Sequence, residues 1–409
     1  MICGLLGEHL GHSYSPQIHS LLGDYSYDLF EVTPENLEDF LLHGEFDGLN
    51  VTIPYKKAVI PYCAALSETA KAMGSVNTIV RRPDGSLYGD NTDFHGFSWL
   101  LSRNDPIQKG EKALVLGTGG ASVTVQAVLR RMGAEVAVLS RRGENNYGTL
   151  ERHADAVLVV NATPVGMYPR NGERLIDLDR LPNLRCVLDL IYNPARTALL
   201  LDSEVRGIPC ENGLSMLVAQ AKRAAELFTN SAIPDSRCEE ILRRLEGQMQ
   251  NLILIGMPGC GKSTVGKLVA DRLRRPFVDA DEAICQAVGC DIPTFFAKNG
   301  EEAFRRVETS VLADLCKKSG QVIATGGGCI TRPENYPLLH QNGEIVWIQR
   351  ELASLPVDGR PVSAKTPPER LYQLRKPLYE AFADRVAVND QSPETAAARV
   401  LALAGLDSD

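Results

Sequence analysis

The sequence predicts an α/β protein in which two glycine-rich turns each join a buried strand to a helix. The first turn lies within Leu114–Ser122 and reads LVLGTGGAS, and the second lies within Leu252–Thr264 and reads LILIGMPGCGKST. Short apolar strands alternate with helical stretches around both turns, a pattern typical of sheets covered by helices. The 409 residues are enough for two or three domains.

The alternation divides the chain into four stretches. Residues 1–100 contain expected strands and helices, and so do residues 113–210 around the first turn. Residues 213–246 read as helix, with Gly247 expected to end it, and a fresh α/β pattern starts at Leu252. The expected strands are Ile2–Leu6, Tyr27–Val32, Gly48–Thr52, Thr78–Arg81, Ala113–Leu116, Glu135–Ser140, Ala156–Asn161 and Cys186–Ile191. The expected helices of the first stretch are Pro16–Leu22, Leu37–Leu42 and Lys57–Cys63.

Composition excludes several classes of protein. The net charge of −8 argues against a nucleic-acid partner, and no apolar run approaches the roughly 18 residues of a membrane helix. The first residues lack a basic segment followed by a long apolar one, so we expect no signal peptide. The ten cysteines are scattered without a Cys-x-x-Cys pair, which indicates reduced thiols in a cytoplasmic protein.

The second turn matches the phosphate-binding pattern G-x-x-x-x-G-K-[S/T] in full. Glycines let successive backbone N–H groups point at phosphate oxygens, and the following helix N-terminus favours negative charge. Lys262 is expected to reach the β- and γ-phosphates of ATP, and the Ser263 hydroxyl is expected to bind Mg²⁺. The predicted ATP-binding residues are Gly256, Gly259, Cys260, Gly261, Lys262, Ser263 and Thr264.

The first turn, Gly117-Thr118-Gly119-Gly120-Ala121, departs from the full dinucleotide spacing and is the weaker signal. After the next expected strand comes Ser140-Arg141-Arg142. Arginine suits a ribose 2′-phosphate, whereas an acidic residue there would bind a 2′-hydroxyl, so these residues favour NADP over NAD. A solvated basic turn is the alternative.

Polar clusters interrupt the apolar pattern of residues 1–100. Taken singly, such clusters are usually turns or helix caps. In this order, and beside a dinucleotide turn, they resemble shikimate dehydrogenase across about residues 1–246. The matching segments are Gly11–Pro16 with His19, Asn50–Lys56, Gly74–Ile79, Gly89–Asp93 with Gly96-Phe97, Gly117–Ser122, Asn161–Met167, Asp189–Pro194 with Thr197, and Asn212–Leu217 with Gln220.

The resemblance implies NADP-dependent reduction of 3-dehydroshikimate to shikimate. It makes Lys56 and Asp93 the catalytic pair and places Thr163 near the cofactor. It also implies a substrate domain of residues 1–100 plus 213–246 and a Rossmann-like NADP domain of residues 101–212. The implied substrate-binding residues are Ser13, Ser15, Thr52, Asn77, Tyr192 and Gln220.

Two departures from the family stand out. Only residues 143–160 separate Arg142 from Asn161, where the family usually has a further helix and strand. We therefore expect a trimmed NADP domain with a smaller sheet and a less enclosed adenosine pocket. Ser215 stands where the family usually has glycine near the nicotinamide.

Residues 249–409 resemble shikimate kinase, a P-loop α/β/α fold with a parallel sheet. The matching segments are the phosphate loop, Asp279–Asp281, Phe296, Gly300-Glu301, Phe304–Glu308, Val322–Gly328, Gly359–Pro361 and Arg375–Tyr379. Met249 stands where an independent chain could have begun, which suggests a gene fusion.

The second resemblance assigns roles around shikimate. Arg305 and Arg375 would bind its carboxylate, which guanidinium groups do in bidentate fashion. Asp281 would hydrogen-bond the attacking hydroxyl, and Gly327 would offer a backbone N–H. Asp279 would hold Mg²⁺ through water, and Arg360, with Lys262, would neutralise charge on the transferring phosphoryl group. The lid from Trp347 to Arg360 is shorter than usual and shows no counterpart of the family's adenine-stacking arginine.

Together the two resemblances predict a bifunctional enzyme of the shikimate pathway. It would use NADP(H), ATP and Mg²⁺ and act on two small molecules, 3-dehydroshikimate and shikimate. A dehydrogenase that prefers quinate, and a sensor that binds pathway metabolites without turnover, remain as alternatives. Oligomeric state and domain orientation are left open.

Overall fold

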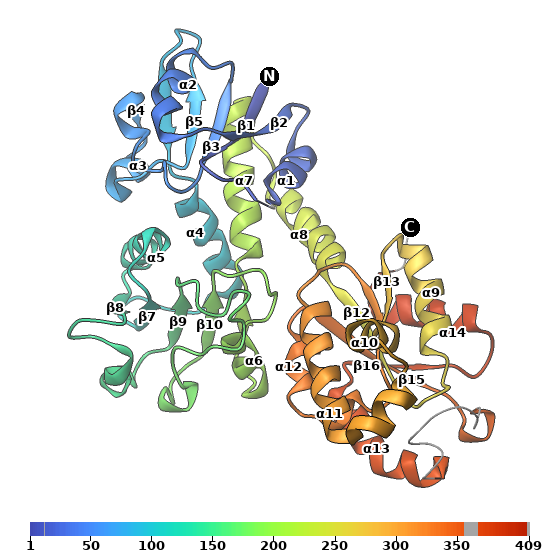
Figure 1. Cartoon of the computed structure of the whole chain (residues 1–409). Helices are drawn as coiled ribbons and strands as arrows, with labels where there is room; N and C mark the ends of the chain where they lie inside the picture. The colour runs from blue at the N-terminus through green and yellow to red at the C-terminus, as the bar shows by residue number, and fades with distance from the viewer. Residues whose placement is uncertain (12, 356–366, 407–409) are drawn as a thin grey trace. The chain divides into compact units, whose positions relative to one another are not determined.

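The computed structural model describes residues 1–11, 13–355 and 367–406 and divides the chain into two compact units (Figure 1). Unit 1 comprises Met1–Tyr192 and Leu199–Arg243, and unit 2 comprises Asn193–Ala198 and Arg244–Asp409. Helix α8 (Asp235–Met249) contributes residues to both units without a break. The expected division of the dehydrogenase half into two domains stays a prediction.

Unit 1 begins with a mixed six-stranded sheet in the order β2-β1-β3-β5-β6-β4. β1, β2 and β3 are parallel, whereas β5 is antiparallel to both β3 and β6. Its strands are β1 (Ile2–Gly7), β2 (Ser26–Glu31), β3 (Gly48–Val51), β4 (Cys63–Leu66), β5 (Thr78–Arg81) and β6 (Leu87–Asp90). Its helices are α1 (Ser15–Leu22), α2 (Leu37–His43) and α3 (Glu68–Met73), with short 3₁₀ turns η1 (Pro34–Asn36) and η2 (Ile60–Tyr62).

The expected helix Lys57–Cys63 is wrong. A single 3₁₀ turn forms at Ile60–Tyr62, and the chain then enters β4, a strand that the apolar pattern did not indicate. Pro61 lacks the N–H that a longer helix would need, which explains why helical spacing alone misled.

A second sheet of unit 1 is entirely parallel, in the order β11-β10-β9-β7-β8. Only the 3₁₀ helix η3 (Tyr147–His153) lies between β8 and β9, and β8 is an edge strand, so the predicted lack of a further helix and strand is confirmed. The less enclosed adenosine pocket stays a prediction. The strands are β7 (Lys112–Leu116), β8 (Glu135–Leu139), β9 (Leu158–Asn161), β10 (Cys186–Asp189) and β11 (Cys210–Glu211). The connecting helices are α5 (Gly120–Arg131), η4 (Leu178–Arg180) and α6 (Ala198–Val205).

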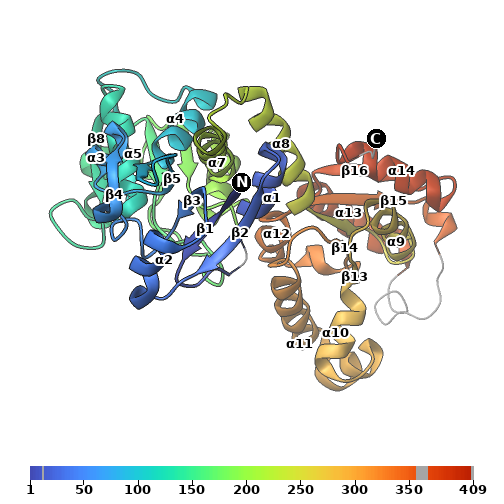
Figure 2. The ribbon, with the colours of Figure 1, turned by 90° about the horizontal axis from the view of Figure 1, so that it is seen from above.

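Two long helices of unit 1 lie side by side, α4 (Asp93–Asn104) and α7 (Leu214–Thr229) (Figure 2). The expected helical stretch 213–246 is therefore two helices, since the chain leaves α7 at Asn230, in left-handed conformation, before α8 starts. The expected stop at Gly247 is wrong, because α8 continues to Met249. Gly247 has no left-handed backbone angle that would end a helix.

Unit 2 has a parallel five-stranded sheet in the order β13-β14-β12-β15-β16. Every residue of the central strand β12 is buried, which is typical of a parallel strand covered on both faces. Its strands are β12 (Asn251–Ile255), β13 (Phe277–Asp279), β14 (Val322–Ala324), β15 (Gly343–Gln349) and β16 (Arg385–Val388). The helices are α9 (Lys262–Leu273), α10 (Ala280–Val288), α11 (Ile292–Leu315), α12 (Asn335–His340), α13 (Pro368–Phe382) and α14 (Pro393–Leu403), with short turns η5 (Cys329–Thr331) and η6 (Leu352–Ser354).

Each of the three sheets has its own apolar core. In unit 2, α9 packs beside α14 (Figure 1). The parallel strands end at one edge of each sheet, where loops of an α/β fold bind ligands. In the part of the chain that the structure describes, no helix combines the length and apolar character of a membrane span.

Candidate active sites

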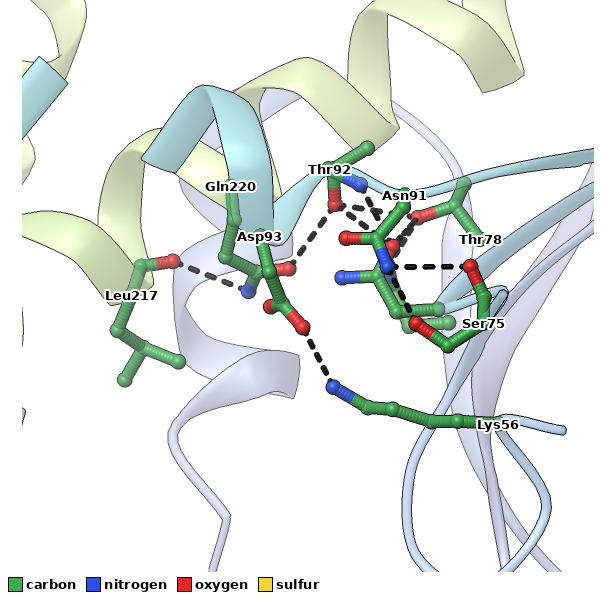
Figure 3. A network of polar contacts seen from close by, with 10 residues as sticks. Lys56, Ser75, Thr78, Asn91, Thr92, Asp93, Leu217 and Gln220 are labelled. Atoms are coloured by element: carbon green, nitrogen blue, oxygen red, sulfur yellow. Dashed lines mark hydrogen bonds and ion pairs between the residues drawn. The ribbon is translucent and has the colours of Figure 1, made fainter. Parts of the chain in front are cut away.

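An ion pair between Lys56 and Asp93 lies at the centre of the first site (Figure 3). Lys56 follows β3 in a turn, and Asp93 is the first residue of α4 after β6. Lys56 Nζ lies 2.6 Å from Asp93 Oδ2, and the two side chains keep 33% and 20% of their surface exposed. The pair is thus fixed in geometry yet open to a ligand.

Asn77 and Gln220 meet beside this pair through Thr92. The Thr92 backbone N–H donates to Asn77 Oδ1 at 2.7 Å, and Thr92 Oγ1 lies 3.3 Å from Gln220 Oε1. Next to them Asn91 Nδ2 donates to Ser75 Oγ at 2.8 Å, which holds the loop before β5 (Figure 3). The structure therefore brings four of the expected residues, Lys56, Asn77, Asp93 and Gln220, into one cluster.

Ser13, Ser15 and Thr52 follow neighbouring parallel strands. Ser13 Oγ accepts the Ser15 N–H at 3.2 Å, and Ser15 is a nearly buried residue at the start of α1. Thr52 comes directly after β3, and its N–H donates to the carbonyl of Leu6 in β1 at 3.0 Å. Because β1 and β3 are parallel neighbours, their following loops lie at one edge of the sheet.

Tyr192 follows β10 and packs edge to face against Tyr14, with ring centroids 6.0 Å apart. Burial, and secondarily the Tyr14 phenol, raises the pKa of the Tyr192 phenol, so it stays a neutral hydrogen-bond donor at physiological pH. Tyr14 lies between Ser13 and Ser15, which connects Tyr192 to the serine cluster.

The first glycine turn fits a dinucleotide phosphate. Gly117 has φ of +104°, and a Cβ there would lie 2.7 Å from Thr163 Cγ2, so only glycine is accommodated. A Cβ on Gly119 or Gly120 would meet nothing within 4 Å, which leaves the N-terminus of α5 open for an anion, with Ala121 also exposed. Thr163 Oγ1 is held by Asn161 Oδ1 at 2.7 Å.

Ser140, Arg141 and Arg142 lie at the carboxyl end of β8, next to β7 and its glycine turn. The Ser140 hydroxyl donates to the Arg142 carbonyl, which closes a tight turn. Both arginines are exposed. Their position beside the turn suits the 2′-phosphate of NADP, and the open N-terminus of α5 suits its pyrophosphate.

The second glycine turn folds around the Lys262 ammonium. Lys262 Nζ donates to the carbonyls of Gly256 at 3.0 Å and Met257 at 3.1 Å. Positive φ angles at Gly256, Gly259 and Gly261 shape the loop, and a Cβ at Gly261 would lie 2.6 Å from Asn389 Nδ2. Asn389 Nδ2 also donates to the carbonyl of Cys260, a buried residue of the loop, at 2.9 Å.

The Ser263 hydroxyl and the Asp279 carboxylate lie beside this loop and could bind Mg²⁺. Ser263 Oγ donates to Asp279 Oδ2 at 2.6 Å, and Asp279 Oδ1 accepts the Asp281 N–H at 3.0 Å. Mg²⁺ typically takes one or two protein oxygens together with phosphate oxygens and water, so the pair fits it. Among the described residues no group of three or more His, Cys, Asp or Glu side chains could hold a metal alone.

These residues open onto a cavity of about 660 Å³ in unit 2. Its walls include Thr264, Asp281, Arg305, Gly327 and Arg375 as well as the phosphate loop. The apolar side chains of Ile292, Pro293, Phe296 and Phe304 also line it, and of these only Phe296 and Phe304 stood in the sequence motifs. The predicted kinase substrate residues thus share one cavity with all the predicted ATP-binding residues except Gly256 and Cys260.

Arg305 is held rigidly at the cavity wall. Its Nη1 lies 2.6 Å from Glu308 Oε2, and Glu308 is 1% exposed. Burial raises the pKa of the Glu308 carboxyl, and Arg305 opposes that rise. A Cβ at Gly328 would collide with Arg305 Nη2, so the glycine makes room for the guanidinium.

Gly327 and Arg375 contact one another, since Arg375 Nη1 donates to the Gly327 carbonyl at 3.0 Å. The Tyr379 hydroxyl donates to the same carbonyl at 2.7 Å. A Cβ at Gly326 would lie 2.8 Å from Asp281 Oδ1, which places that carboxylate against the glycine run. Arg360 lies outside the described residues.

Sequence reasoning gave no role to Thr92, Glu308 or Tyr379. All three stood in the sequence motifs. Glu308 pairs with Arg305, three residues away on the same helix, whereas the partners of Thr92 and Tyr379 are distant in sequence. Gln220 lies 128 residues from Thr92, and Gly327 lies 52 residues from Tyr379. The spacing of a motif carries no signal for such contacts.

Two family models match the chain. The shikimate dehydrogenase substrate-binding domain matches residues 5–79, and shikimate kinase matches residues 258–404. An NADP(+)-dependent shikimate dehydrogenase of Clostridium perfringens is 34% identical over 265 residues, which is 59% of this chain and 97% of that protein.

Solved structures agree over the same part of the chain. A chorismate mutase/shikimate 5-dehydrogenase fusion protein of Clostridium acetobutylicum is 36% identical with a TM-score of 0.56, covering 60% of this chain and 96% of that one. Shikimate 5-dehydrogenase of Thermus thermophilus, in complex with NADP(H) and shikimate, is 31% identical with a TM-score of 0.54, covering 60% and 99%.

Fold and sites together define an oxidoreductase with a Rossmann-like cofactor domain, joined in one chain to a P-loop kinase. The chain belongs to the shikimate dehydrogenase family over its N-terminal part and carries a shikimate kinase domain after it. Both resemblances drawn from the sequence are confirmed. NADP for the first activity, and ATP with Mg²⁺ for the second, follow from these families.

Proposed function

We propose that the chain carries out two consecutive steps on one ring acid. Unit 1 reduces 3-dehydroshikimate to shikimate with NADPH, and unit 2 phosphorylates shikimate to shikimate 3-phosphate with ATP. The proposal rests on two separate observations. Unit 1 holds the Lys56 ammonium in an ion pair, and unit 2 has a cavity lined by the phosphate loop, Arg305 and Arg375.

In the first step Lys56 donates to the carbonyl oxygen of the substrate. NADPH supplies a hydride to the carbonyl carbon and leaves as NADP⁺. Negative charge then builds on the oxygen, and an ammonium at hydrogen-bond distance stabilises it and passes on a proton. Asp93, 2.6 Å from Lys56, keeps that ammonium oriented and can accept a neighbouring substrate hydroxyl.

The remaining expected residues bind the ring acid. Ser13, Ser15, Thr52 and Tyr192 supply hydroxyls, and Asn77 and Gln220 supply amides, an inventory that suits hydroxyls and a carboxylate. At the cofactor turn Gly117, Gly119, Gly120 and Ala121 bind the pyrophosphate, and Thr163 supports the turn. Ser140, Arg141 and Arg142 bind the 2′-phosphate.

In the second step the shikimate hydroxyl attacks the γ-phosphorus and releases its proton to solvent. ATP supplies the phosphoryl group and leaves as ADP. Asp281 orients the attacking hydroxyl, while Arg305 and Arg375 bind the carboxylate and Gly327 offers its backbone N–H. Lys262 stabilises the β- and γ-phosphates, a role that Arg360 shares, and Ser263 with water-bridged Asp279 holds Mg²⁺. Gly256, Gly259, Cys260, Gly261 and Thr264 supply the rest of the phosphate loop.

Two assays on one purified sample test the proposal. Shikimate-dependent reduction of NADP⁺ reports the first site, and ATP-dependent phosphorylation of shikimate reports the second. Quinate is run beside shikimate in the first assay. We expect turnover in both assays and a higher kcat/KM for shikimate than for quinate. Binding of shikimate by calorimetry without turnover in either assay would instead indicate a sensor.

A further inference from the structure

Thr92 occupies a buried position between β6 and α4, with 1% of its surface exposed. It stands at the N-cap of α4, yet its side chain makes no capping hydrogen bond. The hydroxyl instead faces three oxygens. Thr78 Oγ1 lies at 3.2 Å and Gln220 Oε1 at 3.3 Å (Figure 3). Asn77 Oδ1 also lies at 3.3 Å. The Thr92 hydroxyl therefore has a role other than helix capping.

The supply of protons decides which of these contacts are hydrogen bonds. Each hydroxyl has one proton, and an amide oxygen only accepts. Asn77 Oδ1 already accepts the Thr92 N–H at 2.7 Å and lies 3.2 Å from the Thr78 hydroxyl, which fills both lone pairs. Thr78 Oγ1 accepts Asn50 Nδ2 at 3.3 Å and donates its own proton to Asn77 Oδ1 at 3.2 Å. The proton of Thr92 is left for Gln220.

These bonds settle the orientation of both side-chain amides. Gln220 Nε2 donates to the Leu217 carbonyl at 3.1 Å, and the flipped amide would set oxygen against oxygen there. Flipping Asn77 would set its NH₂ group against the Thr92 N–H. Hence the Asn77 NH₂ group and the second Nε2 proton of Gln220 are the donors that remain for a ligand beside Lys56 and Asp93.

We propose that Thr92 is a positioning residue of the dehydrogenase site. Its hydroxyl holds Gln220 Oε1 and its backbone N–H holds Asn77 Oδ1, so both amides present N–H donors to oxygens of the substrate. The inference rests on the proposed function, in which Asn77 and Gln220 contact shikimate. Thr92 itself acts through these two amides and does not touch the reacting atoms.

A double-mutant cycle with Gln220 tests this role. Thr92→Val removes the hydroxyl at constant shape and keeps the backbone N–H, so Gln220 Oε1 loses its hydroxyl donor while Asn77 Oδ1 keeps its 2.7 Å bond to the Thr92 N–H. We expect Thr92→Val to raise the KM for shikimate about 2- to 10-fold, as the loss of one neutral hydrogen bond would. The KM for NADP⁺ should not change, and Thr92→Ser should retain near wild-type values. In a Gln220→Ala background, Thr92→Val should have no further effect on kcat/KM.

Several results would overturn the inference. The inference fails if Thr92→Val has the wild-type KM for shikimate. It also fails if Thr92→Val lowers kcat/KM as much in the Gln220→Ala background as in the wild-type background, since Thr92 would then act through another residue. Thermal unfolding checks that each variant is folded, and Thr92→Ala replaces Thr92→Val if the latter is not. Failure of the proposed function looks different, because wild-type protein would then show no shikimate-dependent reduction of NADP⁺.

Discussion

Lys56 and Asp93 are close enough for a strong ion pair but keep a fifth to a third of their surface exposed. Exposed pairs contribute little to stability because water and salt screen them. We therefore expect Lys56→Met to leave the unfolding temperature nearly unchanged while it lowers dehydrogenase kcat at least about 100-fold, the usual range for a lost general acid. Thermal unfolding and steady-state kinetics on the same samples measure both quantities.

The neighbouring lysine provides the matched control. Lys57 is exposed, and no ion pair is recorded for it among the described residues, so Lys57→Met should keep wild-type turnover. Equal losses in the two variants would show that general surface charge, and not the position of Lys56, supports the reaction.

His19 makes the stability of unit 1 depend on pH. It stacks on Tyr27 with ring centroids 4.0 Å apart and shares a 2.6 Å hydrogen bond with the Tyr25 hydroxyl. Burial lowers the pKa of His19 from 6.5 to about 3. Between pH 6.5 and about 3, His19 is therefore protonated in the unfolded chain but neutral in the folded chain. The folded state loses stability as the pH falls through this range.

One proton corresponds to at most about 1.4 kcal/mol of unfolding free energy per pH unit. We expect urea unfolding at pH 7.5, 6 and 5 to give a smaller loss of stability for His19→Gln than for wild type. His43→Gln, at the exposed end of α2, is the control and should follow wild type. Parallel slopes for wild type and His19→Gln would contradict this account.

At the scale of elements, helix α13 supports the glycine run that lines the kinase cavity. Tyr379 is completely buried, stacks on Trp347 at 5.4 Å and donates its hydroxyl to the Gly327 carbonyl. Arg375, one turn earlier on α13, binds the same carbonyl. One helix therefore fixes both Arg375, which we expect to bind substrate, and the backbone of Gly327.

Removing the Tyr379 hydroxyl should loosen this support. We expect Tyr379→Phe to lower the free energy of unfolding by about 1 kcal/mol, the usual net value of a hydrogen bond, and to raise the kinase KM for shikimate severalfold. The KM for ATP should change little. Tyr372→Phe, on the same helix, is the control, and an equal rise in its KM for shikimate would refute the specific role of Tyr379.

Strands with continuous apolar runs, and both glycine turns, could be predicted from sequence because their signals are local. β12, β7 and the helices that follow them are of this kind. β4 could not be, since its pattern of half-exposed residues has no clear period and its pairing with β6 is set by contacts distant in sequence. Likewise α8 continues past Gly247 to Met249, although glycine has a low helix propensity.

The candidate sites divide in the same way. Residues whose chemistry is carried by a motif, such as Lys262 or Lys56, were named from the sequence. Residues that act on other side chains, such as Thr92 on Gln220, were named only from the structure. The trimmed β8–β9 connection is an exception, since the short spacing between Arg142 and Asn161 was enough to predict it.

At the scale of the whole molecule, the residues that we expect to act in each reaction lie within one unit. No expected residue of the dehydrogenase site lies in unit 2, and no expected residue of the kinase site lies in unit 1. We therefore expect each activity to survive loss of the other, even though α8 continues from one unit into the next.

A one-pot assay tests the central claim most directly. Purified protein is mixed with 3-dehydroshikimate, NADPH, ATP and Mg²⁺, and the products are separated over time. Wild type should form shikimate 3-phosphate, Lys262→Met should stop at shikimate, and Lys56→Met should leave 3-dehydroshikimate unconsumed yet phosphorylate added shikimate. If wild type forms no shikimate 3-phosphate, or if Lys262→Met forms it at an undiminished rate, the account of two sites acting in sequence is wrong.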